Sequence, residues 1–211
     1  MKEQHLTVSK TARYYTAGEL TGSTRHVWFA LHGWGMNAKD FLASLEPLVN
    51  EDVFIVAPEA LNRFYLKGSG GQVGATWMTK EDRLNEIKDY IAYLDSLYRH
   101  FADTIPNNAT VTALGFSQGA ATVTRWVHAG NCRIDNLVVF AGEVGPELLP
   151  LAADSGLKRT RNYFMCGTHD AIFTPPIVTE MKEKYRELNF DYTDFTGRHE
   201  INTQVLEQLL K

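Results

Sequence analysis

A serine between two glycines, in the run Gly115-Phe116-Ser117-Gln118-Gly119, is the first candidate for chemistry in this sequence. The run follows an apolar, strand-like stretch and precedes a helical stretch rich in small residues. A Gly-x-Ser-x-Gly turn in this context raises the serine hydroxyl above the edge of a sheet, where it can act as a nucleophile. The backbone N–H of Gln118 would face the negative charge that develops on the attacked oxygen. The other interpretation of the run is a simple tight turn.

A nucleophilic serine on this kind of turn is followed along the chain first by an acid and then by a histidine. His199 fits the base, because it lies in a loop after the last expected strand and before the last expected helix. Asp170 fits the acid, because it comes just after a strand and so lies at the same edge of the sheet as Ser117. Glu143, after the preceding strand, is the rival acid. The residue order predicts a triad of Ser117, Asp170 and His199.

The turn after the first apolar strand supplies a second candidate donor. It reads His32-Gly33-Trp34-Gly35, and its glycines allow the backbone N–H of Trp34 to point into the site. Two N–H groups from different loops are the usual arrangement for binding an oxyanion. We therefore expect Trp34 and Gln118 to form an oxyanion hole, with His32 supporting the loop.

The same turn also fits a weaker pattern, Gly-x-Gly-x-x-Ala, over residues 33–38. Glu59 follows the next strand at about the distance at which a dinucleotide-binding protein holds an acid for the ribose. An NAD(P)-binding oxidoreductase is therefore one alternative, although it leaves Ser117, Asp170 and His199 without a role. A binding protein that has the same fold but no catalytic activity is the other alternative.

Short apolar runs alternate with amphipathic segments along the chain, which is typical of a single α/β domain over residues 1–211. Most apolar runs are continuous and predict parallel strands buried on both faces. These strands are expected at 27–31, 53–57, 110–114, 137–141, 161–166 and 191–195. Helices are expected after Asn37, over 79–101, after Ser117, over 179–188 and from Thr203. Two N-terminal runs, 6–9 and 13–17, predict a β-hairpin within residues 1–20.

The connection over residues 58–78 contains several glycines and shows no periodicity. A structureless connection of about 20 residues in a compact domain is often functional. We therefore interpret it as an active-site loop, with a solvated surface loop as the alternative. Candidates for lining an apolar substrate pocket are Trp34, Phe64, Tyr65, Trp77 and Phe173, and ordinary packing is the alternative for each.

Composition narrows the classes of partner. The 211 residues include 21 Lys and Arg against 25 Asp and Glu, a formal net charge of −4, so the basic surface required by nucleic acid is not expected. Cys132 and Cys166 form neither a disulfide framework nor a metal pattern. The longest apolar run, 137–141, is far shorter than the roughly 20 residues that span a bilayer, and the polar N-terminus lacks the apolar run of a signal peptide. We expect a cytoplasmic protein without stable membrane insertion, and a homodimer is left open.

These motifs resemble those of the phospholipase/carboxylesterase family of small α/β-hydrolases, which includes the acyl-protein thioesterases. The resemblance is carried by His32-Gly33-Trp34-Gly35, Gly115-Phe116-Ser117-Gln118-Gly119, Gly167-Thr168-His169-Asp170 and Gly197-Arg198-His199. It implies an α/β-hydrolase domain with a mostly parallel sheet, helices on both faces and no large cap domain. It also implies a serine hydrolase that cleaves small-molecule or lipid-like carboxylic esters or thioesters through an acyl-enzyme, without a metal or organic cofactor.

Overall fold

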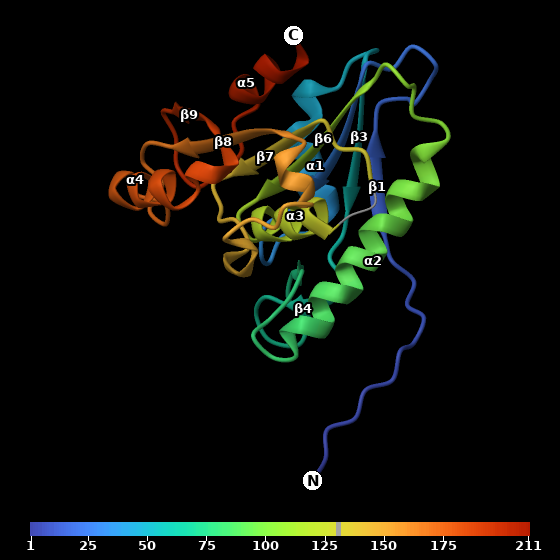
Figure 1. Cartoon of the computed structure of the whole chain (residues 1–211). Coiled ribbons are helices and arrows are strands. Elements are labelled where there is room, and N and C mark those ends of the chain that lie inside the picture. The colour runs from blue at the N-terminus through green and yellow to red at the C-terminus, as the bar shows by residue number, and fades with distance from the viewer. Residues whose placement is uncertain (130–131) are drawn as a thin grey trace.

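Seven strands form the central sheet of the computed structural model, which describes residues 1–129 and 132–211 (Figure 1). The order across the sheet is β1-β3-β2-β6-β7-β8-β9, and only β1 runs antiparallel to its neighbour. Two further strands, β4 and β5, form a separate small sheet. The strands are β1 (Tyr14–Ala17), β2 (His26–Leu31), β3 (Val53–Pro58), β4 (Asn62–Tyr65), β5 (Val73–Thr76), β6 (Thr110–Phe116), β7 (Asn136–Phe140), β8 (Arg161–Gly167) and β9 (Asp191–Phe195).

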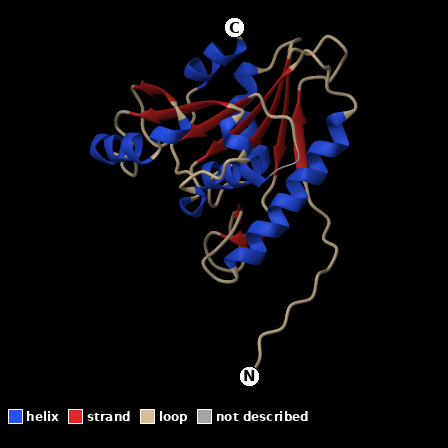
Figure 2. Ribbon diagram, in the orientation of Figure 1, coloured by secondary structure: helices blue, strands red, loops and turns tan. Residues whose placement is uncertain are grey.

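The central strands are buried because helices cover both faces of the sheet (Figure 2). Every residue of β3 and β7 is buried, which confirms the continuous apolar runs as a largely parallel sheet. The α-helices are α1 (Ala38–Leu45), α2 (Arg83–Ala102), α3 (Gln118–Ala129), α4 (Pro175–Lys184) and α5 (Thr203–Leu206). Short 3₁₀ helices are η1 (Glu46–Leu48), η2 (Pro146–Leu148), η3 (Gly156–Lys158), η4 (Arg186–Leu188) and η5 (Glu207–Leu210).

The direction of each crossover decides which face its helix covers. Crossovers between parallel strands are right-handed, so a connection that turns back along the sheet places its helix on the opposite face. The chain passes from β2 through α1 to β3 in one direction, and from β6 through α3 to β7 in the other. As a result α3 packs against α2 on one face, while α5 contacts η1, next to α1, on the other.

The same change of direction creates a topological switch point between β2 and β6. Strands β2 and β6 are neighbours, with Leu31 paired to Gly115 near their carboxyl ends. The chain leaves β2 towards β3 and leaves β6 towards β7, so the two loops diverge at this point. In open α/β sheets, ligands bind in the crevice outside the carboxyl ends of the strands at such a switch point.

The N-terminal segment differs from the expected hairpin. Residues 6–9 form no strand, and Leu6 and Val8 are exposed. Strand β1 pairs with β3 instead, and the neighbouring Arg13 forms an ion pair with the buried Glu59. An isolated two-stranded hairpin is marginally stable in water, whereas the edge of the large sheet supplies hydrogen bonds and a buried carboxylate.

The connection over 58–78 is more ordered than its glycines suggest. Strands β4 and β5 form an antiparallel hairpin within it, with Phe64 opposite Gly74. Another difference lies at α4, which begins at Pro175 instead of residue 179. Because proline fits the first turn of a helix, where its missing N–H has no intrahelical partner, the proline pair starts the helix and does not precede it.

Candidate active site

Ser117 lies between β6 and α3 in a backbone conformation that is rare for a residue with a side chain. Its φ is +53°, in the left-handed region. The flanking glycines are required sterically: a Cβ at Gly115 would lie 2.3 Å from the carbonyl oxygen of Gly119, and one at Gly119 would lie 2.3 Å from that of Leu31. The sequence therefore folds here into a tight strand–turn–helix, which positions Ser117 at the carboxyl edge of the sheet.

His199 and Asp170 come together at the same edge, from the loops after β9 and β8. His199 Nδ1 lies 2.7 Å from Asp170 Oδ2. The imidazole ring packs against Phe173, with ring centroids 5.9 Å apart, and against Phe116, with centroids 5.0 Å apart. Because Phe116 directly precedes Ser117, the ring of His199 is held beside the serine turn.

The carboxylate of Asp170 accepts hydrogen bonds on both of its oxygens. Its Oδ1 accepts hydrogen bonds from the backbone N–H groups of Ile172 (2.7 Å) and Phe173 (3.0 Å), and its side chain is completely buried. Burial alone would raise the pKa of Asp170, but the hydrogen bonds from Phe173, His199 and Ile172 outweigh it and hold the pKa below its usual value. Asp170 is therefore ionised at neutral pH and accepts the hydrogen bond from Nδ1–H of His199, so Nε2 is the nitrogen left without a partner among the described residues.

The rival acid, Glu143, is not the carboxylate that pairs with His199. Glu143 is exposed after β7, and the imidazole of His199 pairs with Asp170. His169, next to the acid, is exposed and lies within hydrogen-bonding distance of the Thr168 hydroxyl.

The loops after β2 and β6 meet next to Ser117. A Cβ at Gly33 would lie 3.2 Å from the Cβ of Ser117, so the two loops are in contact. The backbone N–H groups of Trp34 and Gln118 find no acceptor among residues 1–129 and 132–211. The two free donors lie on two loops that are in contact with each other. An oxyanion hole requires such a pair of unoccupied N–H groups.

His32 and Glu59 are structural groups in this fold. His32 is fully buried, with Nδ1 2.7 Å from the carbonyl oxygen of Gly33 and Nε2 accepting from the N–H of Ala60 at 3.1 Å. Burial lowers the pKa of His32 and keeps the ring neutral. Glu59 is buried beside Arg13, and its other oxygen accepts from the N–H of Ala38. This carboxylate is occupied, so it is not available for the ribose of a dinucleotide.

The candidate pocket residues divide into three groups. Trp34 is 61% exposed and packs against the half-buried Phe64, with ring centroids 5.4 Å apart, while Tyr65 is exposed on the same hairpin. Phe173 is nearly buried against His199. The expectation for Trp77 is wrong: its ring is buried against His32, and its Nε1 donates to the carbonyl oxygen of His32 at 2.8 Å.

Two features of the site were missed by sequence reasoning. Ile172 is a large apolar residue that is 56% exposed, two residues after Asp170, and its position in the acid loop was the available signal. The side chain of Gln118 bonds to the segment after β5, a contact between residues 40 or more positions apart that no local pattern indicates.

Two cavities of the described structure are lined by residues other than Ser117. One cavity of about 140 Å³ lies beside Phe173 and Cys166, and another of about 460 Å³ lies at the amino ends of β8 and β9, on the opposite edge from the serine. Volume alone therefore does not mark the candidate site.

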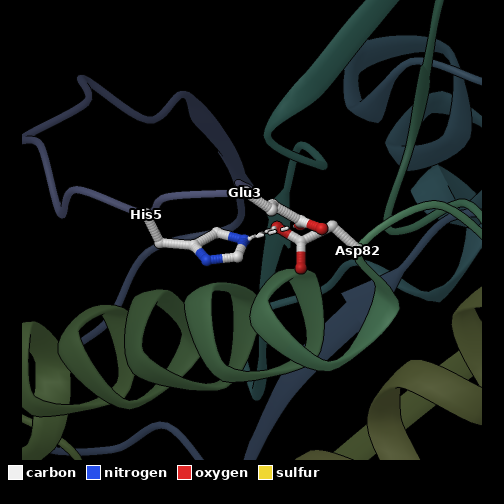
Figure 3. Close-up of side chains that lie close together, drawn as sticks. All are labelled: Glu3, His5 and Asp82. Atoms are coloured by element: carbon white, nitrogen blue, oxygen red, sulfur yellow. Dashed lines mark ion pairs between the residues drawn. The ribbon is translucent and has the colours of Figure 1, made fainter. Parts of the chain in front are cut away.

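One exposed cluster joins the N-terminal segment to the start of α2 (Figure 3). His5 Nε2 lies 3.1 Å from a carboxylate oxygen of Glu3 and 3.3 Å from one of Asp82. Among the described residues this is the group whose ligand atoms are close enough to surround a metal ion. All three side chains are exposed, and surface ion pairs account for the distances.

The sheet order, the strained serine turn and the acid–histidine pair after the last two strands together define an α/β-hydrolase fold. No protein-family model and no curated protein sequence matches the chain. In the described residues, none of the helices combines the length and apolar character needed to cross a membrane.

Solved structures share this fold over nearly the whole chain. Acyl-protein thioesterase 2 from Zea mays is similar with a TM-score of 0.70 and 16% identity, covering 94% of this chain and 96% of that one. A phospholipase/carboxylesterase from Dyadobacter fermentans has a TM-score of 0.65 and 18% identity, covering 97% and 99%. The carboxylesterase of Bacillus cereus has a TM-score of 0.63 and 18% identity, covering 94% and 91%. At these identities the likeness establishes the α/β-hydrolase fold with no large cap domain.

Proposed function

We propose that this protein is a serine hydrolase that cleaves carboxylic esters or thioesters through an acyl-enzyme on Ser117. The observation that carries the proposal is the 2.7 Å contact between His199 Nδ1 and the buried carboxylate of Asp170, at the edge of the sheet where Ser117 sits on its strained turn. The names of the structural neighbours, a thioesterase and two carboxylesterases, support the same class of reaction.

In the proposed mechanism, His199 Nε2 takes the proton of the Ser117 hydroxyl as its oxygen attacks the acyl carbon. The oxyanion lies between the N–H groups of Trp34 and Gln118. The bond from the acyl carbon to the leaving oxygen or sulfur then breaks, and the leaving group takes the proton from His199. In the second half, His199 removes a proton from water, the hydroxide attacks the acyl carbon, and Ser117 leaves with that proton.

The apolar side chains near the site support an acyl group of some length. Trp34 and Phe64 lie on the side of the β2 loop, and Ile172 lies on the side of the acid loop. An alkyl chain that covers these exposed surfaces would gain about 0.8 kcal/mol for each buried methylene. The substrate class that fits is an uncharged or lipid-like acyl ester or thioester.

The proposal is tested by ester turnover and by labelling of the nucleophile. We expect the purified protein to hydrolyse p-nitrophenyl esters and to react with a fluorophosphonate, which mass spectrometry should place on Ser117. Ser117→Ala should abolish both, whereas the exposed Ser96→Ala serves as the matched control and should abolish neither. Full ester turnover in Ser117→Ala would overturn the proposal, and a thermal shift with NAD(P) in the absence of labelling would favour the oxidoreductase.

A further inference from the structure

The hairpin formed by β4 and β5 contacts both loops that carry the candidate oxyanion donors. Ala75 in β5 bonds to the Trp34 loop in both directions: its carbonyl oxygen accepts from the N–H of Gly35 and its N–H donates to the carbonyl oxygen of Met36, each at 2.9 Å. The hairpin is therefore joined to this loop by backbone hydrogen bonds, as one strand is joined to another.

Gly74 brings the two backbones into direct contact. A Cβ at Gly74 would lie 2.2 Å from the carbonyl oxygen of Gly35 and 2.6 Å from its carbonyl carbon. These are backbone atoms that cannot rotate away, so any side chain at Gly74 would push the Trp34 loop aside. The glycine is required because the loop and the hairpin approach so closely.

The side chain of Gln118 connects the second donor loop, to which it belongs, to the end of β5 and the residues that follow it. Its Oε1 accepts from the N–H of Trp77 at 3.1 Å, and its Nε2 donates to the carbonyl oxygen of Met78 at 2.9 Å and to Thr76 Oγ1 at 3.0 Å. A backbone N–H can only donate and a carbonyl can only accept, so this geometry fits an amide and not a carboxylate.

Both donor loops are thus attached to one stretch of chain, residues 74–78. This stretch is largely buried. The hydrogen bond from Trp77 Nε1 to the carbonyl oxygen of His32 attaches it to the residue directly after β2 as well. The strands β2 and β6 fix where the two loops begin, and the loops touch each other at Gly33 and Ser117. Residues 74–78 add a second constraint, because hydrogen bonds attach this one stretch to both loops beyond the ends of their strands.

We propose that residues 74–78 set the spacing of the oxyanion hole, and that Gln118, Thr76 and Gly74 are positioning residues for the hydrolysis. The proposal rests on the proposed function, because it concerns the same oxyanion. The side chain of Gln118 acts by holding its own backbone N–H in place, so a substitution at this position keeps the donor and loosens its support.

The expected effect lies in kcat, because the oxyanion forms only in the transition state. Loss of one oxyanion donor costs about 10²–10³ in kcat, and a displacement of about 1 Å can cost about 10². We therefore expect Gln118→Leu to lower kcat by about 10- to 100-fold and to change KM less than about threefold. Thr76→Val and Gly74→Ala should lower kcat in the same way, and Thr76→Ser, which keeps the hydroxyl, should restore most of it.

The experiment measures kcat per active site and the affinity of a tetrahedral analogue. Active sites are counted by complete fluorophosphonate labelling, so that a smaller folded fraction does not register as a slower enzyme. An aryl boronic acid that adds to Ser117 should bind more weakly to Gln118→Leu by about the factor lost in kcat/KM. Gln204→Leu, the same change at an exposed glutamine on α5, should leave both quantities as in the wild type.

Two outcomes overturn the proposal. One is a kcat per active site within twofold of wild type in Gln118→Leu and Gly74→Ala; the other is an unchanged boronate affinity in Gln118→Leu. Ser117→Ala, assayed in parallel, separates this failure from that of the proposed function. If Ser117→Ala is inactive and Gln118→Leu is not impaired, the spacing role alone is wrong; if Ser117→Ala remains active, the hydrolase itself is wrong.

Discussion

His32 and His199 both follow parallel strands at the same edge of the sheet, and their surroundings differ in every respect that affects chemistry. His32 has no exposed surface, and both ring nitrogens are engaged by backbone groups. His199 has a side chain that is 22% exposed, with one nitrogen on a buried carboxylate and, among the described residues, no partner for the other. This difference makes His199 the candidate base of the proposed mechanism, because one of its nitrogens is held by an ionised acid and the other has no partner among the described residues.

The two carboxylates of these regions differ in the same way. Glu59 is enclosed by Arg13 and by the first N–H of α1, so its charge serves the packing of β1 and α1. Asp170 is surrounded by neutral N–H groups and one imidazole, so its charge acts on His199. Burial makes both carboxylates strong local charges, and the partner decides what each charge does.

The largest expected effect is the loss of kcat when His199 is replaced. His199→Ala should lower kcat by about 10⁴-fold or more, because in the proposed mechanism His199 takes the proton of Ser117. The melting temperature should fall by a few degrees only, because the variant loses the ring that packs on Phe116 and Phe173 while Asp170 keeps its two backbone donors. Ester turnover and calorimetry on the same preparation test this, with the exposed His100→Ala as the matched control.

The next effect concerns the carboxylate that orients the base. Asp170→Asn should lower kcat by about 10³- to 10⁴-fold, because an amide N–H facing Nδ1 favours the tautomer with its proton on Nε2. Glu59→Gln is the comparison variant: it changes an equally buried carboxylate at the same edge and should alter stability with little effect on kcat per active site. Equal losses of kcat in the two variants would contradict the distinction drawn between them.

For His32 the expected effect is on stability. His32→Ala removes the acceptor of the Ala60 N–H and the ring that packs on Trp77, so the free energy of unfolding should fall by about 2–4 kcal/mol. The loss of kcat per active site should be far smaller than in His199→Ala. Urea denaturation and active-site titration measure the two quantities. A stable His32→Ala protein as inactive as His199→Ala would place His32 in the chemistry.

The smallest effect is a pH dependence of stability. Because burial lowers the pKa of His32 in the folded state, the unfolded chain binds the proton more readily at pH values below its unfolded pKa of about 6.5. The stabilising contribution of a neutral His32 is therefore present above about pH 6.5 and decreases as the pH falls. His32→Gln should make the free energy of unfolding less dependent on pH below 6.5, by up to about 1.4 kcal/mol per pH unit. Identical pH profiles for the two proteins would show that His32 keeps an ordinary pKa.

The sheet and the positions of the candidate residues followed from local patterns. Continuous apolar runs located the buried strands, and the chain order of Ser117, Asp170 and His199 selected three residues that topology places at one edge. The preference for Asp170 over Glu143 agrees with the contact to His199. The fold prediction is confirmed because it depends on a period that the sequence shows directly, whereas the catalytic roles of the three residues stay a prediction.

The remaining features depend on contacts between distant parts of the chain. The indole of Trp77 pairs with His32 and not with a substrate, and the Gly-rich connection folds into a hairpin because Ala75 bonds to the loop after β2. Strand β1 pairs with β3 and not with the segment 6–9, because the edge of the large sheet supplies backbone hydrogen-bond partners. In each case the partner lies more than 35 positions away, so neither periodicity nor local propensity indicates it.

The hairpin also suggests where this scaffold tolerates redesign. A Cβ at Gly70, at its tip, meets no atom within 4 Å, whereas one at Gly74, at its base, meets the backbone of Gly35. Gly68 has a φ of +57°, which favours glycine, so loop grafts and insertion libraries should be accepted between Gly68 and Gly71, close to Leu66, which contacts the Trp34 loop. In the proposed hydrolase, a protein engineer could vary the surface beside Trp34 at the tip while the segment 74–78 keeps its hydrogen bonds to both donor loops.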